Sequence, residues 1–304
     1  MIRDFLFRRG TRRDTSQVRT YYQNGLQADE RLASRDPNNV VLQRNLSVSQ
    51  EKYGNVLLEQ GSFAEALAAY RASLAIRDRL VKLGPENAEW QRDRAVSYTK
   101  IGDALAKAGN LEQALANYRT SKEIFKQLAE DDPANGQRQQ DLALSLIMIG
   151  DMLEKQHSLG EALASFGTAL AILDRLAKAL QKNNEVNRCL WVCLDRIGDV
   201  LQAQGDLAKA ASSFEAALSI KEIFVEGARY AETGTEEDAL VPEFAKGLGK
   251  LAFVLDRMGH RSEALGRLRR GREVLQRLAA VKPRWNDLVA GLDKLIAGLT
   301  ISPG

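Results

Sequence analysis

Residues 101–129 read IGDALAKAGNLEQALANYRTSKEIFKQLA, and the fold can be inferred from the pattern of this stretch. Before Gly109, apolar and small residues recur at intervals of three and four, which is the periodicity of one helix face. The pair Gly109-Asn110 breaks the pattern, and a second amphipathic stretch runs from Leu111 to Ala129. The stretch therefore predicts two helices joined by a tight turn.

The same unit recurs along most of the chain. A glycine at the centre of the first helix returns every 48 residues, as Gly54, Gly102, Gly150 and Gly198. An alanine of the second helix keeps the same period, with six inserted residues before its last member; the positions are Ala66, Ala114, Ala162, Ala210 and Ala264. Self-similarity at a fixed period of about 20 to 50 residues is typical of stacked supersecondary units. We therefore expect a helical repeat array.

Turns and breaks keep the same register. The turns between first and second helices are expected at Gly61, Gly109, His157, Gly205 and Gly259. The units are separated by prolines, which push the preceding residue out of helical geometry. These prolines are Pro37, Pro85, Pro133 and Pro283. Each repeat is therefore expected to consist of helix, tight turn, helix and loop.

The recurring glycine needs a structural reason, because glycine inside a helix costs about 1 kcal/mol relative to alanine. We expect the first helix to approach the recurring small alanine of the second helix closely. Aromatic residues one turn later would then fill the space between the two helices. These residues are Tyr70, Tyr118, Phe166 and Phe214.

This combination of small, apolar and aromatic positions resembles the tetratricopeptide repeat, whose familiar unit has about 34 residues. The resemblance covers about residues 16–283 and is closest to a long-helix bacterial variety, in which such arrays are found beside signalling and effector domains. It implies an all-α, right-handed superhelical solenoid of about twelve antiparallel helices. Gln50 departs from the pattern, because a bulkier residue is common at its position.

The repeats suggest a division of the chain. Residues 1–15 form a basic tail, and residues 16–36 form a half repeat that consists of a second helix alone. Complete repeats are expected at about 38–84, 86–132, 134–182, 184–240 and 241–283. The fourth of these contains the insertion and an acidic loop at residues 236–238. Residues 284–304 are expected to form a capping helix, with Leu288, Leu292, Leu295 and Leu299 on its apolar face, and a tail.

Composition restricts the environment of the protein. The formal net charge of +3 is small for 304 residues and gives no bulk argument for nucleic acid. No apolar run approaches the roughly 18 residues that a membrane span needs, and the first nine residues have too short an apolar core for a secretory signal. Two cysteines cannot form a disulfide framework. A cytoplasmic protein is therefore expected.

In the architecture that the resemblance implies, first helices line the concave face, so their polar positions are the candidate site. The candidate residues are Glu51, Asn55, Thr99, Asp103, Asp151, Glu154, Asp195 and Asp199. They predict a mildly acidic groove for a basic or amide-rich peptide. Alternatively, Lys100–Asp103 and Arg196–Asp199 pair three residues apart within their helices, and the aspartates lie on a solvated face. Asp195 and Asp199 favour a bound cation, because like charges four residues apart are destabilising.

A second candidate surface lies near the C-terminus, where Arg267, Arg270 and Arg277 share one helix stripe. This patch could dock an acidic protein or a sister domain, or bind the phosphates of RNA or DNA. A solvated outer helix is the alternative. Single-strand recognition has little support, because Trp285 is the only aromatic residue nearby.

Motifs for catalysis and metal binding are scarce. Cys189 and Cys193 lie one helical turn apart, but a tetrahedral metal site needs four ligands, so Cys193 is best interpreted as a small residue. His157 and His260 lie at or beside turns, without a nucleophile or a phosphate-binding loop. We therefore expect a non-catalytic protein–protein interaction scaffold without metal, cofactor or small-molecule substrate. A nucleic-acid-associated factor is the alternative, and the oligomeric state stays open.

Overall fold

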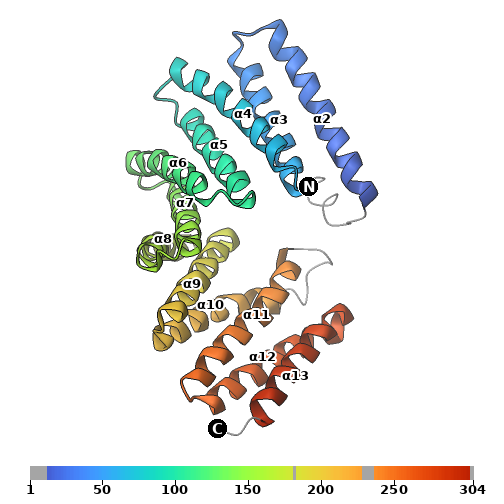
Figure 1. The fold of residues 1–304 in the computed structure, drawn as a ribbon, viewed down its shortest axis with the longest axis vertical. Coiled ribbons are helices and arrows are strands. Elements are labelled where there is room, and N and C mark those ends of the chain that lie inside the picture. The colour runs from blue at the N-terminus through green and yellow to red at the C-terminus, as the bar shows by residue number, and fades with distance from the viewer. Residues whose placement is uncertain (1–11, 181–182, 228–235, 302–304) are drawn as a thin grey trace. The chain divides into compact units, whose positions relative to one another are not determined.

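The computed structural model describes residues 12–180, 183–227 and 236–301. These residues form twelve α-helices and one short 3-10 helix, η1 (Pro283–Trp285), and contain no strand (Figure 1). The helices are α2 (Arg12–Arg35), α3 (Val40–Glu59), α4 (Phe63–Leu83), α5 (Ala88–Lys107), α6 (Leu111–Asp131), α7 (Gly136–Lys155), α8 (Leu159–Ala179), α9 (Asn184–Gln204), α10 (Leu207–Gly227), α11 (Glu236–Arg257), α12 (Arg261–Val281) and α13 (Asn286–Ile301). The protein is thus an all-α helical repeat solenoid.

The chain divides into two compact units between Ser158 and Leu159. In the first unit, each helix from α2 to α7 packs against the next helix in sequence, and α3 also contacts α5. In the second unit, the same neighbour packing runs from α8 to α13, with further contacts of α10 with α12 and of α11 with α13. Each unit therefore has a core built from helix pairs that are consecutive in the chain.

Two helix boundaries differ from the expected ones. Helix α2 begins at Arg12, within the stretch expected to be a tail, whereas the basic residues Arg3, Arg8 and Arg9 lie outside the described residues. Residues 236–238, expected in an acidic loop, open helix α11, and residues 228–235 before them lie outside the described part of the chain. Acidic residues are favourable in the first turn of a helix, so an acidic run suits a helix start as well as a loop.

The predicted turn positions are confirmed by the backbone. The residues between first and second helices all have positive φ angles: Gly61 at 78°, Gly109 at 84°, His157 at 60°, Gly205 at 84° and Gly259 at 81°. The left-handed region is easily reached by glycine but is unfavourable for a residue with a Cβ. His157 therefore has the left-handed backbone conformation that glycine has in the other four turns.

The same asparagine cap starts four of the first helices. The side-chain oxygen of Asn87 accepts a hydrogen bond from the backbone N–H of Trp90 at 3.1 Å, and its counterparts cap α3, α7 and α9 in the same way. These counterparts are Asn39, Asn135 and Asn183. An asparagine cap stabilises a helix by about 1 kcal/mol relative to alanine. The inter-repeat loops thus determine where each of these helices begins.

Three of the four mid-helix glycines lie directly against aromatic rings. A Cβ on Gly102 would lie 2.6 Å from Cε1 of Tyr118, and a Cβ on Gly54 would lie 2.7 Å from the same atom of Tyr70. Gly198 faces Phe214 in the same manner, at 2.5 Å. The sequence predicts that the recurring alanines impose the close approach. They are buried, but the atoms nearest these three glycines belong to the rings, because a flat ring lies directly on the helix backbone.

The last helix, α13, packs against α12 and α11. Its buried face contains Leu292, but Leu295, expected on the same face, is 46% exposed. Leu288 and Leu299 are half-buried as expected, and the half-buried Ile296 replaces Leu295 on this face. Among the described helices, none is long and apolar enough to span a membrane.

Candidate functional site

A groove of about 670 Å³ in the first unit brings together the C-terminal halves of three first helices, α3, α5 and α7. Tyr22 of α2 and Tyr118 of α6 also line it. Of the eight predicted site residues, only Asn55, Asp103 and Asp151 belong to the lining. The charged and amide residues of the lining are Lys52, Asn55, Glu59, Lys100, Asp103, Lys107, Asp151 and Lys155.

The two tyrosines that lie against Gly54 and Gly102 also donate hydrogen bonds to polar side chains of the groove. The hydroxyl of Tyr118 donates a 2.8 Å hydrogen bond to Asp103, and the hydroxyl of Tyr70 donates one of the same length to Asn55. Burial raises the pKa of Asp103, while the bond from Tyr118 and the charges of Lys100 and Lys107 oppose the rise. Asn55 and Asp103 are therefore acceptors held in place by tyrosine hydroxyls.

The four lysines of the groove, unlike Asn55 and Asp103, are not held by hydrogen bonds to other described residues. Lys52, Lys107 and Lys155 are exposed and Lys100 is half-buried, and none of the four makes an ion pair or hydrogen bond within the described residues. They outnumber the three carboxylates of the lining. The prediction of an acidic groove is therefore wrong, because each of its three helices carries at least one lysine beside the predicted asparagine or aspartate.

Three predicted residues of the first unit lie away from the lining of the groove, and Thr99 and Glu154 are two of them. The Thr99 hydroxyl forms hydrogen bonds with the Ala95 carbonyl at 3.3 Å and with the Ser121 hydroxyl at 2.8 Å. Glu154, on α7, is half-buried and does not belong to the lining. Thr99 therefore joins helices α5 and α6.

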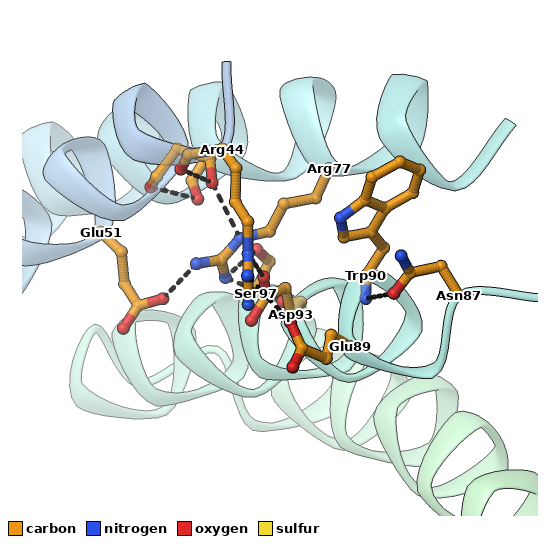
Figure 2. Close-up of polar contacts among 10 residues, drawn as sticks. Arg44, Glu51, Arg77, Asn87, Glu89, Trp90, Asp93 and Ser97 are labelled. Carbon is orange, nitrogen blue, oxygen red and sulfur yellow. Dashed lines mark hydrogen bonds and ion pairs between the residues drawn. The ribbon is translucent and has the colours of Figure 1, made fainter. Parts of the chain in front are cut away.

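Glu51 belongs to a buried polar centre in the first unit. Its carboxylate accepts a 2.8 Å hydrogen bond from Arg77 of α4, which is only 2% exposed. Figure 2 shows the Arg77 guanidinium between Glu51 of α3 and two partners on α5. These partners are the Asp93 carbonyl oxygen at 2.8 Å and the Ser97 hydroxyl at 2.9 Å. Glu51 thus helps to join three helices.

Asp195 has the corresponding role in the second unit. It forms a buried ion pair with Lys221 of α10, and Lys221 also donates to the Glu243 carbonyl of α11 at 3.4 Å. Burial lowers the pKa of Lys221, while the Asp195 charge opposes this effect. The cation expected for this aspartate is therefore supplied by the chain itself.

The sequence contains a signal for these two pairs. Arg77 and Lys221 occupy a position of the second helix that is apolar in the other three complete repeats, and each lies 26 residues after its carboxylate. The apolar members are Phe125, Leu173 and Leu275. A cation in an apolar column indicates a buried partner, because unpaired buried charges are very unfavourable.

The remaining predicted residue, Asp199, is also paired. Its two carboxylate oxygens accept hydrogen bonds from Lys250 of α11 at 2.6 and 2.7 Å, and Arg196 lies 3.8 Å away in its own helix. The expected pairing of Arg196 with Asp199 is thus present, but Lys250 makes the closer contact. Asp199 therefore joins two first helices.

Similar ion pairs connect the first helices of the first unit. Arg44 of α3 contacts Asp93 at 2.8 Å and Glu89 at 2.9 Å, both on α5 (Figure 2). One repeat later, Arg92 contacts Asp141 of α7 at 2.5 Å. Since Arg44 and Asp93, like Arg92 and Asp141, lie 49 residues apart, each pair connects one repeat with the next.

The predicted arginine patch lies opposite an acidic stripe. Arg267 pairs with Glu215, Arg270 contacts Glu222 at 3.1 Å, and Arg277 lies 3.8 Å from Glu226. All three glutamates belong to α10, which packs against α12. The arginines remain accessible to solvent, but the glutamates of α10 balance much of their positive charge.

The two cysteines are structural in this arrangement. Both are buried thiols outside any disulfide, and Cys193 donates a 3.2 Å hydrogen bond to the Phe166 carbonyl. Within the described part of the chain, no group of three or more histidine, cysteine, aspartate or glutamate side chains is arranged to hold a metal ion.

Comparison with known proteins assigns the fold to a family. The family model described as "Tetratricopeptide repeat" matches residues 95–128 and 193–224, which cover most of α5–α6 and α9–α10. The chain contains tetratricopeptide repeats. A search of curated proteins finds no significant match to its sequence.

Solved structures share the helical architecture of this chain. BtubC (BKLC) from P. vanneervenii matches with a TM-score of 0.63 and 14% identity over 93% of both chains. The apo form of RapI matches at 0.59 and 13% identity, over 91% of this chain and 69% of that one. Aspartyl phosphate phosphatase F from Bacillus subtilis matches at 0.56 and 12% identity, over 88% and 63% respectively. At these identities the similarity concerns the fold.

Proposed function

We propose that this protein is a non-catalytic interaction scaffold whose first-unit groove binds an extended segment of a partner protein. One observation carries the proposal: four lysines that make no ion pair or hydrogen bond among the described residues line a groove of about 670 Å³. Solvent-accessible cations that converge on a concave surface favour an anionic ligand and raise its association rate. The groove chemistry therefore favours a partner segment that carries carboxylates.

The sequence predicts a basic or amide-rich partner, whereas we propose an acidic one. Asp103 already accepts a hydrogen bond from Tyr118, and burial disfavours its charged form. It therefore attracts a basic side chain weakly, but its remaining acceptor capacity and that of Asn55 can take backbone N–H groups of a bound strand. The lysines then contact acidic side chains of that strand.

The spacing of the helices suggests the spacing of the acidic residues. Packed helices lie about 8–10 Å apart, and an extended chain advances about 3.3 Å per residue. One first helix therefore meets about every third residue of the segment. A segment with acidic residues at this interval would place one carboxylate beside the lysines of each successive helix.

The experiment is a fluorescence-anisotropy titration of the full chain with three labelled peptides of equal length. One peptide has glutamate at every third position, one has lysine there, and one has serine there. We expect the acidic peptide to bind most tightly, with an affinity that falls as salt rises. Equal affinity for all three peptides, or preference for the basic one, would contradict the proposal.

Matched variants locate the contact. Lys100→Ala and Lys107→Ala should each weaken acidic-peptide binding several-fold, mainly through the association rate. Lys82→Ala is the control, because Lys82 is an exposed residue of α4 outside the groove lining. If the control variant loses as much affinity as the groove variants, the peptide binds through general attraction and not through the groove.

We do not propose nucleic acid as a second ligand. That alternative depended on Arg267, Arg270 and Arg277, whose charges face the glutamates of α10. A phosphate-binding surface gains affinity by releasing counterions from phosphates that its cations neutralise. Arginines already neutralised within the protein contribute less to this gain.

A further inference from the structure

The second unit has a separate pocket of about 260 Å³ between α9, α10 and α11. It does not share a residue with the groove of the first unit, so a ligand bound there would be independent of the proposed function. Its lining consists of Trp191, Val192, Asp195, Arg196, Lys221, Glu243, Lys246, Gly247 and Lys250. The buried ion pair of Lys221 with Asp195 thus forms one wall of the pocket.

This pocket occupies the register that Arg77 fills in the first unit. There, the guanidinium bonds to Glu51, Ser47, Ser97 and the Asp93 carbonyl. In the second unit, the arginine is replaced by a shorter lysine, the glutamate by a shorter aspartate, and Ser97 by a glycine. The replacing residues are Lys221, Asp195 and Gly247. Each of the three replacing residues is smaller than its counterpart in the first unit. A pocket lies beside the ion pair that two of them form.

Trp191 and Asp195 each carry a buried polar atom that has no hydrogen-bond partner among the residues that the structure describes. These atoms are the indole Nε1 of Trp191, a donor that stands in the register of Ser47, and Oδ1 of Asp195, an acceptor. Both residues are more than nine-tenths buried, at 6% and 8% exposure. Buried polar groups are nearly always paired, so these two atoms indicate a ligand that accepts one hydrogen bond and donates another.

The net charge of the lining indicates that the ligand is negatively charged. Four cationic residues face two carboxylates: Arg196, Lys221, Lys246 and Lys250 against Asp195 and Glu243. Lys246 is exposed and makes no ion pair within the part of the chain that the structure describes. A water molecule could pair with the two unsatisfied atoms, but it would not balance the excess positive charge.

We propose that this pocket binds a small oxyanion that keeps a proton at neutral pH, namely inorganic phosphate. Its oxygens accept hydrogen bonds from Trp191 Nε1 and Lys246, and its protonated oxygen donates to Asp195 Oδ1. A neutral donor–acceptor ligand would leave Lys246 without an anionic partner. A fully deprotonated oxyanion would place an acceptor against the carboxylate oxygen of Asp195, which is repulsive.

The test compares inorganic phosphate with sulfate by isothermal titration calorimetry of the full chain, at neutral pH and constant ionic strength. Sulfate has a similar size and charge but no proton to donate to Asp195. We expect phosphate to bind at least about tenfold more tightly, which corresponds to one lost hydrogen bond to a charged group. Equal affinities, or no detectable phosphate binding, would overturn the proposal.

Substitutions in the lining test whether phosphate binds in this pocket. Lys246→Ala and Trp191→Phe should each weaken phosphate binding several-fold, and the second keeps an aromatic ring in the core. Lys294→Ala is the control, because Lys294 is an exposed lysine of α13 outside the lining. Unchanged phosphate binding by Lys246→Ala, with circular dichroism like the parent, would overturn the site.

Discussion

Lys221 and Asp195 form a buried ion pair in the same register as Arg77 and Glu51, three repeats later in the array. In both pairs, a second helix supplies the cation and the preceding first helix supplies the carboxylate. The cation also bonds to a backbone carbonyl of the following first helix, that of Asp93 or Glu243. Each of the two buried charge pairs thus connects three consecutive helices.

Removing one partner of such a pair should be more destabilising than replacing both. Arg77→Phe leaves the Glu51 carboxylate without its partner, and we expect a loss of about 3–5 kcal/mol in the free energy of unfolding. The double variant Arg77→Phe with Glu51→Thr installs the residues of the next repeat, Phe125 and Thr99, and should recover most of this loss. Urea denaturation of both variants measures the difference.

An exposed ion pair is the control for this experiment. Lys178 contacts Asp174 at 2.6 Å on the surface of α8, and Lys178→Ala should change stability by less than about 0.5 kcal/mol. If the double variant is as unstable as Arg77→Phe alone, the loss comes from the other bonds of Arg77 and not from the unpaired carboxylate.

Gly102→Ala should destabilise the first unit, although alanine is the better helix former. The added Cβ would lie 2.6 Å from the Tyr118 ring, so the ring or the helix must move, at a cost of about 1–3 kcal/mol. Gly266→Ala is the control, because nothing lies within 4 Å of its Cβ position in α12. That variant should be stabilised by about 0.5–1 kcal/mol. Thermal melts in which the two variants shift alike would contradict this account.

Asp103→Asn should stabilise the protein at neutral pH. Burial raises the pKa of Asp103, so its ionised form is less favourable in the folded state than in the unfolded state. This penalty is complete above the folded-state pKa and disappears below the unfolded-state pKa. The advantage of asparagine should therefore shrink as the pH falls through this window. Asn55 already accepts the equivalent tyrosine bond, so the substitution keeps the hydrogen bond from Tyr118.

Thermal melts of Asp103→Asn and the parent over an acidic-to-neutral pH series measure this effect. The outcome that contradicts the prediction is a variant that is less stable at neutral pH, or a difference that grows on acidification. Either result would mean that the ionised carboxylate stabilises the fold, for example through Lys100 and Lys107.

His157→Gly should raise stability by up to about 1 kcal/mol. His157 has a φ of 60°, in a region that a residue with a Cβ reaches at a cost of about 1–2 kcal/mol, and the greater flexibility of unfolded glycine offsets part of the gain. The reverse change, Gly205→Ala at a φ of 84°, should lower stability by a similar amount. Urea denaturation that ranks these variants in the opposite order would show that the His157 side chain makes a stabilising contact of its own.

The repeat, the helix pairs and the turns can all be predicted from the amino-acid sequence. These features depend on local chemistry: glycine reaches positive φ at Gly109, proline at Pro85 precludes a continuous helix, and apolar residues recur with the helical period. The aspartates of the first helices could also be found, because their positions repeat. Interactions within one helix or one turn need no knowledge of the neighbouring helices.

The contacts of those polar residues, in contrast, depend on how the helices pack in three dimensions. Asp195 and Asp199 look like an open acidic site in the sequence, but Lys221 and Lys250 reach them from positions 26 and 51 residues away. The arginines of α12 likewise face glutamates of α10. A charge is available to a ligand only when the fold leaves it unpaired, and pairing across helices depends on which faces pack together. Among the described residues, that packing leaves the groove lysines without an ion pair or hydrogen bond. It pairs Asp195 and Asp199, which the sequence alone presents as ligand-binding carboxylates.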